Sequence, residues 1–111
     1  MPKLFVYGSL RKGMSQHHHL KDQKFVGLAR SVKNFLLEKV LSPEDQQSYA
    51  IAREDKNGDK LNGEIYEIGD DILQMIDEYE EYPALYDRRA FDFITDEGTT
   101  IEALMYCGHR R

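Results

Sequence analysis

Cysteine, tryptophan and long apolar runs are scarce or missing in this sequence. Its single cysteine, Cys107, cannot form an internal disulfide, which indicates a reducing compartment. No apolar run has the length of a transmembrane helix, and residues 4–10 are too short, and interrupted by Gly8, to form a signal peptide. We therefore expect a cytoplasmic protein without a membrane partner.

Positive charge is also in short supply. The 111 residues carry 15 Lys and Arg against 20 Asp and Glu, which gives a net charge of −5. An acidic protein is repelled by nucleic acid and by anionic lipid, so neither is expected as the main partner. The length suits one domain with one core, residues 1–111, and the 41% of hydrophobic residues is ordinary for a globular protein.

Alternating apolar residues and turn signals predict about six short strands, joined mostly by hairpins. The strands are expected at residues 3–7, 24–29, 49–54, 61–68, 86–95 and 100–107, with a less clear strand-like run at 32–38. The pair Asn57-Gly58 predicts a hairpin between 49–54 and 61–68, and Gly98 predicts another between the last two strands. With a short helix at 16–21, a loop at 41–47 and one longer helix, the pattern indicates an α+β domain whose sheet is mainly antiparallel. The pattern leaves open whether this sheet closes into a small barrel.

The longer helix is predicted over residues 69–83. Apolar side chains recur there at i, i+3, i+4 and i+7, at Ile72, Met75, Ile76 and Tyr79. Asp70 is a suitable N-cap, and Pro83 is expected to mark the end of the helix.

Glu80 is an acid on the apolar side of this helix. At about 100° per residue it projects between Ile76 and Leu73, whereas the neighbouring acids project to the polar side: Asp77, Glu78 and Glu81. Lost hydration, repulsion by nearby acids and the negative end of the helix dipole should all raise the pKa of Glu80. A carboxyl with a raised pKa suits proton transfer near neutral pH. The alternative is that Glu80 lies at the edge of the apolar stripe and reaches water.

The turn after the first strand is a second candidate. Successive backbone N–H groups around Gly8 can form a concave anion-binding nest, so residues 7–10 could hold a carboxylate or a phosphate. The turn lacks the longer glycine pattern of a nucleotide-binding loop, and an ordinary tight turn is the alternative.

Three other features are expected to be structural. The consecutive histidines 17–19 point in different directions, so with His109 they do not form a convincing metal site, and no metal is expected. Cys107 alternates with apolar residues and should be a buried, inert thiol. Glu64 shares a strand face with Tyr66, so it is a rival to Glu80 as an inward-facing acid; a structural role, in which it accepts hydrogen bonds from a neighbouring loop, is at least as well supported.

Two segments together resemble the gamma-glutamylcyclotransferase-like (AIG2-like) family. Residues 6–13, Val-Tyr-Gly-Ser-Leu-Arg-Lys-Gly, resemble its opening signature, and residues 76–88 resemble a second signature, closest to the gamma-glutamylamine cyclotransferase branch. His17, Leu20 and the Gly-Glu-Ile-Tyr of residues 63–66 also match, so the resemblance spans nearly the whole chain.

The resemblance implies a small mixed β-barrel flanked by one or two helices. It also implies an enzyme that cyclises a γ-glutamyl amide to 5-oxoproline and releases an amine, with no cofactor. Glu80 aligns with the catalytic glutamate of the family, and the aligned loop, Tyr7, Gly8, Ser9 and Leu10, holds the glutamyl group through backbone amides. Tyr86 and Tyr106 resemble family tyrosines that orient the substrate.

A non-catalytic module is the alternative function. It would keep the carboxylate-binding loop and sense a small acidic metabolite. Glu80 argues for the enzyme, because a binder of an anion gains nothing from a nearby acid.

Overall fold

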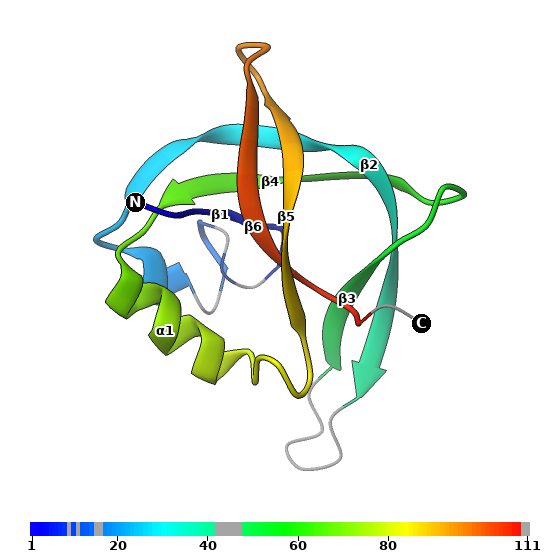
Figure 1. Ribbon diagram of the computed structural model, residues 1–111, viewed down its shortest axis with the longest axis horizontal. Helices are drawn as coiled ribbons and strands as arrows, with labels where there is room; N and C mark the ends of the chain where they lie inside the picture. The colour runs from blue at the N-terminus through cyan, green and yellow to red at the C-terminus, as the bar shows by residue number, and fades with distance from the viewer. Residues whose placement is uncertain (9, 11, 15–16, 42–47, 110–111) are drawn as a thin grey trace.

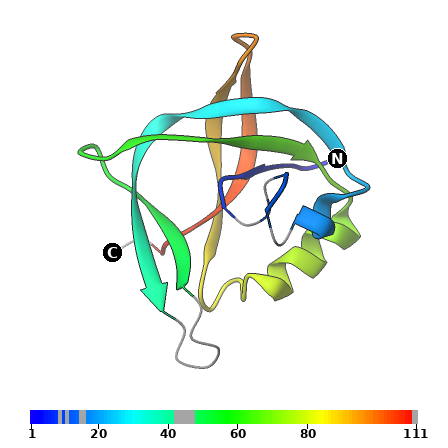
Figure 2. The ribbon, with the colours of Figure 1, turned by 180° about the vertical axis from the view of Figure 1, so that it is seen from behind.

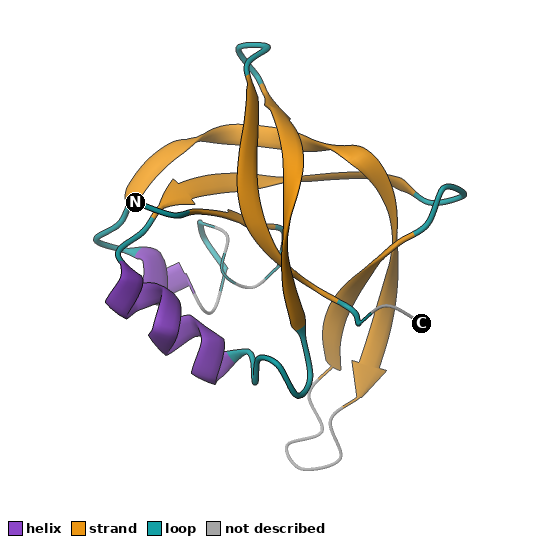
Figure 3. Ribbon diagram, in the orientation of Figure 1, coloured by secondary structure: helices purple, strands orange, loops and turns teal. Residues whose placement is uncertain are grey.

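The computed structural model describes residues 1–8, 10, 12–14, 17–41 and 48–109. Within these residues six strands form one curved sheet with a single α-helix packed against its side (Figures 1, 2 and 3). In chain order the elements are β1 (Lys3–Val6), the 3₁₀ helix η1 (His17–Leu20), β2 (Lys24–Leu41), β3 (Ser48–Glu54), β4 (Asp59–Glu67), α1 (Asp70–Tyr79), β5 (Asp87–Thr95) and β6 (Thr100–Cys107). The predicted α+β class, with a flanking helix, is confirmed.

The sheet closes into a barrel. Its strands follow the order β2, β4, β1, β6 and β5, and β5 pairs with β2 again through Ser31 and Phe93. All of these pairs are antiparallel except β1 with β6, which run parallel. Closure gives each of these five strands a neighbour on both sides, and β3 extends the sheet beside β2. The small mixed barrel implied by the family resemblance is therefore the observed fold.

One long strand replaces two predicted ones. Residues 24–29 and 32–38 both belong to β2, which curves around the barrel (Figure 1). Its pairing with β4 shifts register between Arg30 and Asn34. At this bend the buried hydroxyl of Ser31 accepts the backbone N–H of Leu61 at 2.8 Å and donates to the carbonyl of Lys33 at 2.7 Å. Backbone groups that the bend takes out of the ladder thus keep a partner.

The predicted hairpin between β3 and β4 is wrong. Both strands pair with β2 instead, β4 along its first half and β3 along its second half. The Asn57-Gly58 turn does form, with the Asn57 N–H donating to the Asp55 carboxylate at 2.8 Å. It changes the direction of the chain without bringing its flanking strands together. The second predicted hairpin, between β5 and β6, is confirmed.

The sheet carries a buried apolar cluster on each of its faces. Its inner face fills the barrel with apolar side chains, among them Phe5, Ile65, Phe93, Met105 and Cys107. Its outer face meets α1 and η1 through a second cluster that includes Leu4, Val6, Leu20, Ile76, Tyr86 and Tyr106. Alternation along β1 and β6 therefore supplies both clusters.

The helix begins and ends differently from the prediction. Gly69 rather than Asp70 is the N-cap, and no side chain caps it. Leu73 and Ile76 are buried, whereas Met75 and Tyr79, predicted to be on the apolar stripe, are exposed. The stripe is centred closer to Leu73 than the i, i+3, i+4, i+7 pattern implied.

A Schellman motif ends α1 before Pro83. The N–H of Tyr82 donates to the carbonyl of Asp77 at 2.9 Å, and the N–H of Glu81 donates to that of Glu78 at 3.2 Å. Glu81 occupies the left-handed position, with φ of 54°, where glycine is usual. The residue immediately before it, Glu80, is the C-cap.

Candidate active site

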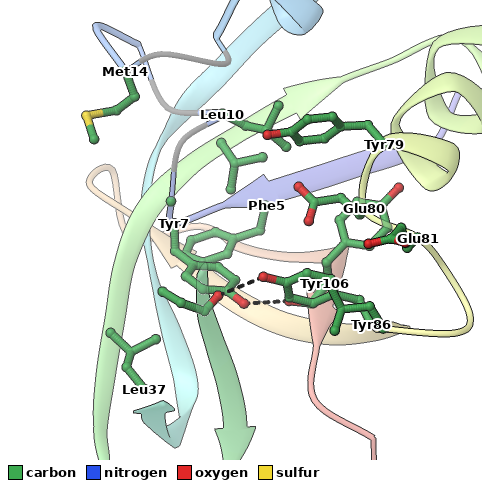
Figure 4. A pocket seen from close by; sticks show the side chains of 14 residues that line it. Phe5, Tyr7, Leu10, Met14, Leu37, Tyr79, Glu80, Glu81, Tyr86 and Tyr106 are labelled. Atoms are coloured by element: carbon green, nitrogen blue, oxygen red, sulfur yellow. Dashed lines mark hydrogen bonds between the residues drawn. The ribbon is translucent and has the colours of Figure 1, made fainter. Parts of the chain in front are cut away.

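A cavity of about 420 Å³ lies where the end of α1 meets the end of β1. Its walls come from the turn after β1, from Leu37 of β2 and Ala50 of β3, from the end of α1 and from β6 (Figure 4). The lining residues are Phe5, Val6, Tyr7, Gly8, Leu10, Met14, Leu37, Ala50, Tyr79, Glu80, Glu81, Leu85, Tyr86 and Tyr106. Six of the seven predicted site residues belong to this set, and the seventh, Ser9, lies outside the described residues.

The Glu80 carboxylate is directed from the helix end toward this cavity (Figure 4). Its backbone N–H donates to the carbonyl of Ile76 at 2.8 Å, so the last turn of the helix fixes its position. Burial raises the pKa of Glu80 from 4.5 to about 7. The rise is the one predicted, and lost hydration is its cause rather than repulsion by the other acids.

Tyr7 crosses the floor of the cavity. Its hydroxyl donates to the carbonyl of Tyr106 at 2.7 Å and accepts the N–H of Ala52 at 3.2 Å. These two bonds connect β1 with β6 and with β3. Burial is the main reason that the pKa of Tyr7 is raised, and the negative charge of Glu80 adds to it. Tyr7 is therefore a neutral phenol near Glu80.

The other two tyrosines form a wall of the cavity. Their rings meet edge to face, with centroids 6.4 Å apart. The hydroxyl of Tyr86 donates to the carbonyl of Ala50 at 3.0 Å, and that of Tyr106 donates to the carboxylate of Asp77 at 2.6 Å. The hydroxyl protons of Tyr7, Tyr86 and Tyr106 thus each have a protein acceptor, and these bonds hold the rings in place.

The loop after β1 is anchored from two sides. The Lys12 N–H donates to the Glu64 carboxylate at 2.7 Å, and the hydroxyl of Tyr66 donates to the same oxygen at 3.1 Å. His17 Nδ1 lies 3.0 Å from the carbonyl of Leu10 and donates to it. The structural role predicted for Glu64 is confirmed. Gly8 and Leu10 line the cavity, whereas anion binding by the loop remains a prediction.

The histidines do not converge. His17 is bonded to the loop, His18 is exposed, and the His19 ring lies 5.0 Å from that of Tyr79. Across the part of the chain that the structure describes, no group of three or more His, Cys, Asp or Glu side chains could hold a metal ion.

Gly63 lets β4 approach β1 closely beside this site. A Cβ atom at Gly63 would lie 2.2 Å from the carbonyl oxygen of Val6 and 2.7 Å from the ring of Phe5. Any side chain there would push the strands apart and displace the turn that β1 leads into. The glycine of the 63–66 motif therefore has a packing reason.

The orientation predicted for Asp77, a neighbour of the site, is wrong. We predicted that it faces solvent, but it is about four-fifths buried and paired with Arg88, with a side-chain exposure of 20%. The guanidinium of Arg88 donates to both of its oxygens, and Tyr106 donates to one. Helical geometry alone cannot reveal this, because both partners come from strands that follow the helix. In the sequence, only the presence of Arg88 at the end of the second motif could have indicated that Asp77 has a cationic partner.

Among the described residues, no helix has both the length and the apolar character required to cross a membrane.

Comparison with known proteins gives consistent matches along the chain. The family described as "Gamma-glutamyl cyclotransferase, AIG2-like" matches residues 4–111. A putative gamma-glutamylcyclotransferase of Methanocaldococcus jannaschii is 35% identical over 107 residues, covering 96% of this chain and 83% of that protein. The gamma-glutamylaminecyclotransferase of Mus musculus is 28% identical, over 96% of this chain and 77% of that protein.

A solved structure supports the same relationship. The crystal structure of an AIG2-like protein from Mus musculus superposes with a TM-score of 0.81 at 28% identity. The alignment covers 96% of this chain and 76% of that one.

Proposed function

The chain belongs to the gamma-glutamyl cyclotransferase, AIG2-like family, and from this premise we propose that it cyclises a γ-glutamyl amine, or a related γ-glutamyl amide, to 5-oxoproline. Glu80 is the general acid/base of the proposed reaction. The observation that carries the proposal is a half-buried carboxyl, with its pKa raised to about 7, that faces a cavity. The family resemblance predicted from the motifs of residues 6–13 and 76–88 is confirmed.

The proposed reaction needs one proton acceptor that later becomes a donor. The α-amine nitrogen of the glutamyl group bonds to its own γ-carbonyl carbon, and the bond from that carbon to the amide nitrogen breaks. The attacking nitrogen loses a proton and the departing nitrogen gains one. A carboxyl whose pKa is near 7 exchanges a proton readily in both directions at neutral pH. The nucleophile is already tethered to its target, so proximity lowers the barrier further.

The surroundings of Glu80 support this role. The cavity wall is apolar where Phe5, Val6 and Leu10 line it, and burial removes water from the Glu80 carboxyl. The neighbouring phenols are held by the protein, and Tyr7 stays neutral, so they add no charge that would compete for the proton.

The glutamyl group would bind at the turn after β1. Gly8 and Leu10 line the cavity there, and Glu64 and His17 hold the loop. Backbone N–H groups of residues 7–10 would receive the substrate carboxylate, since a turn of this kind can form an anion nest. Tyr86 and Tyr106 would orient the chain of the substrate through their fixed rings.

Substitution of the acid tests the proposal. The purified protein is incubated with a panel of γ-glutamyl amines and γ-glutamyl dipeptides, and 5-oxoproline is measured. We expect wild-type release from at least one γ-glutamyl amine and a loss of about 10²- to 10⁴-fold in Glu80→Gln. Glu78→Gln is the matched control, because Glu78 is an exposed acid of the same helix.

Two outcomes would contradict the assignment. Full activity in a folded Glu80→Gln protein would remove the acid/base role. Thermal stabilisation of the wild type by a γ-glutamyl compound, without any release of 5-oxoproline, would favour the binding module instead.

A further inference from the structure

Three hydrogen bonds converge on the carboxylate of Asp77 from outside its helix. Arg88 of β5 donates to both of its oxygens, and the Tyr106 hydroxyl of β6 donates to Oδ1 at 2.6 Å. The side chains of Arg88 and Asp77 are only 21% and 20% exposed. Such shielding makes the contact stronger than an ordinary surface ion pair, which contributes about 0–1 kcal/mol.

The two donors are a matched pair. Arg88 and Tyr106 lie directly opposite one another in the β5–β6 ladder, so their side chains leave the same face of the hairpin. Asp77 lies in the last turn of α1. One carboxylate therefore fastens the end of the helix to both strands of the hairpin.

We call the contact of Asp77 with Arg88 and Tyr106 the helix–hairpin joint. The backbone of Asp77 also contributes to this joint. Its carbonyl accepts the N–H of Tyr82 in the Schellman motif, at 2.9 Å. The guanidinium of Arg88 lies over the ring of Tyr82, 4.7 Å from its centroid. The turn that carries Glu80 is thus held between Asp77 before it and Tyr82 after it.

Further hydrogen bonds connect the helix–hairpin joint to residues that line the cavity. Tyr106 bonds Asp77 through its hydroxyl and accepts the Tyr7 hydroxyl through its carbonyl at 2.7 Å. Tyr7 in turn accepts the N–H of Ala52. A connected series of hydrogen bonds therefore runs from α1 through β6 and β1 to β3, and Glu80 lies at its helix end.

We propose that Asp77 is a positioning residue that holds Glu80 over the cavity through its bonds to Arg88 and Tyr106. The inference rests on the proposed role of Glu80 as acid/base. Asp77 itself is outside the set of described residues that line the cavity, so it acts through its neighbours rather than on the substrate.

The groups around Glu80 determine how its pKa would change if the helix–hairpin joint were loosened. Tyr7 approaches from the end of β1, Tyr86 from the segment before β5, and Tyr106 from β6, while Glu81 and Tyr79 flank Glu80 in the chain. Arg88 brings a positive charge to this end of the helix, and Asp77 pairs with it. If the helix end loosens, water reaches Glu80 and its pKa falls from about 7 toward 4.5.

Two substitutions separate position from charge. Asp77→Asn removes the negative charge and weakens the bonds to both donors. Tyr106→Phe removes one hydrogen bond and leaves the charges of Asp77 and Arg88 unchanged. Glu78→Gln, an exposed neighbour on the same helix, controls for the loss of an acid.

The first readout is kinetic. With a γ-glutamyl amine that the wild type cyclises, we expect kcat to fall about 10- to 100-fold in Asp77→Asn, because small misplacements of a reacting group have effects of this size. Tyr106→Phe should show a smaller loss in the same direction, with KM within about threefold of wild type in both. Glu78→Gln should match the wild type.

The second readout does not need turnover. Carboxyl ¹³C NMR follows the titration of Glu80 in each folded variant, and we expect its pKa to fall by about one unit in Asp77→Asn and by less in Tyr106→Phe. A fall in Asp77→Asn alone would assign the effect to charge and overturn the proposal, as would unchanged titration in both. If Asp77→Asn does not fold, Tyr106→Phe decides. A wild type without activity would refute the proposed function, while the titration would still judge the role of Asp77.

Discussion

The barrel interior and the cavity beside α1 are built from the same strands, yet they do different things. In β6, Met105 and Cys107 point into the barrel, while Tyr106 between them joins the helix side. Burial raises the pKa of the Cys107 thiol, as it raises the pKa of Glu80. The thiol is fully buried in the barrel cluster, whereas Glu80 faces a cavity. The same physical effect therefore accompanies a buried thiol in one region and the proposed acid/base in the other.

The comparison also separates stability from function. Packing inside the barrel should set the free energy of unfolding, and the helix end should set the chemistry. Substitutions on each side test whether the two regions are as independent as this predicts.

Phe93→Ala should have the largest effect on stability. Phe93 is fully buried in the barrel and its ring stacks on Phe5 with centroids 4.0 Å apart. Removing it leaves a cavity and should lower the free energy of unfolding by about 3–5 kcal/mol, measured by urea denaturation. Turnover per folded molecule should stay within a few-fold of wild type. A collapse of kcat with little loss of stability would show that the barrel interior controls the site.

Glu80→Gln, in contrast to Phe93→Ala, should raise the stability of the protein, and the gain should depend on pH. The pKa of Glu80 is raised from 4.5 to about 7 on folding, so its stabilising contribution is complete below pH 4.5 and is lost as pH rises through 7. Gln does not titrate. The free energy of unfolding of the variant should therefore rise relative to that of the wild type across this window, by about 2–3 kcal/mol at pH 8.

Denaturation of both proteins at several pH values between 4 and 8 measures the difference. A constant difference over that range would mean that Glu80 titrates normally in the folded protein, and the raised pKa would have to be abandoned.

Glu64→Ala should loosen the loop after β1. It leaves the Lys12 N–H and the Tyr66 hydroxyl without their acceptor, a change of about 1–2 kcal/mol. Since the loop is proposed to hold the glutamyl carboxylate, we expect KM for a γ-glutamyl amine to rise about tenfold with little change in kcat. Glu67→Ala on the same strand, whose contact with Lys24 is long at 3.9 Å, is the control. Equal KM values in the two variants would argue against a binding role for the loop.

Glu81→Gly should have the smallest effect, and a favourable one. Glu81 adopts the left-handed conformation, with φ of 54°, which is unfavourable for a residue with a side chain. Glycine should raise the melting temperature slightly, corresponding to about 0.5–1 kcal/mol. Unchanged or lower stability would mean that the side chain of Glu81 makes contacts that offset this strain.

Local patterns predicted most elements correctly. Strong alternation fixed β6, and the turn at Gly98 fixed its hairpin with β5, because both depend on residues close in the chain. The Asn57-Gly58 turn was also found, but its flanking strands pair elsewhere. Which strands pair depends on distant partners, and the antiparallel partner of β2 changes from β4 to β3 at Phe35. Strand propensity is a local property, so it cannot predict which strands pair.

The site shows the same division. Helical periodicity placed Glu80 on the buried side because burial is a property of the helix face. Periodicity misplaced Asp77, since its burial comes from Arg88 and Tyr106, which reach it only after β5 and β6 have paired. Met75 and Tyr79 were misplaced for a related reason: the sheet covers the face centred on Leu73 and Ile76.

The sequence by itself determined the chemistry available to this protein: an acid on an apolar helix face, a glycine turn after a strand, and the motifs of its family. Tertiary structure alone decided how these parts meet. Barrel closure brings the ends of β1, β6 and α1 around one cavity, and the hairpin donors reach Asp77 beside it. The physical reason is range: side-chain type and helical phase are local properties, whereas hydration and hydrogen-bond partners depend on residues far away in the chain.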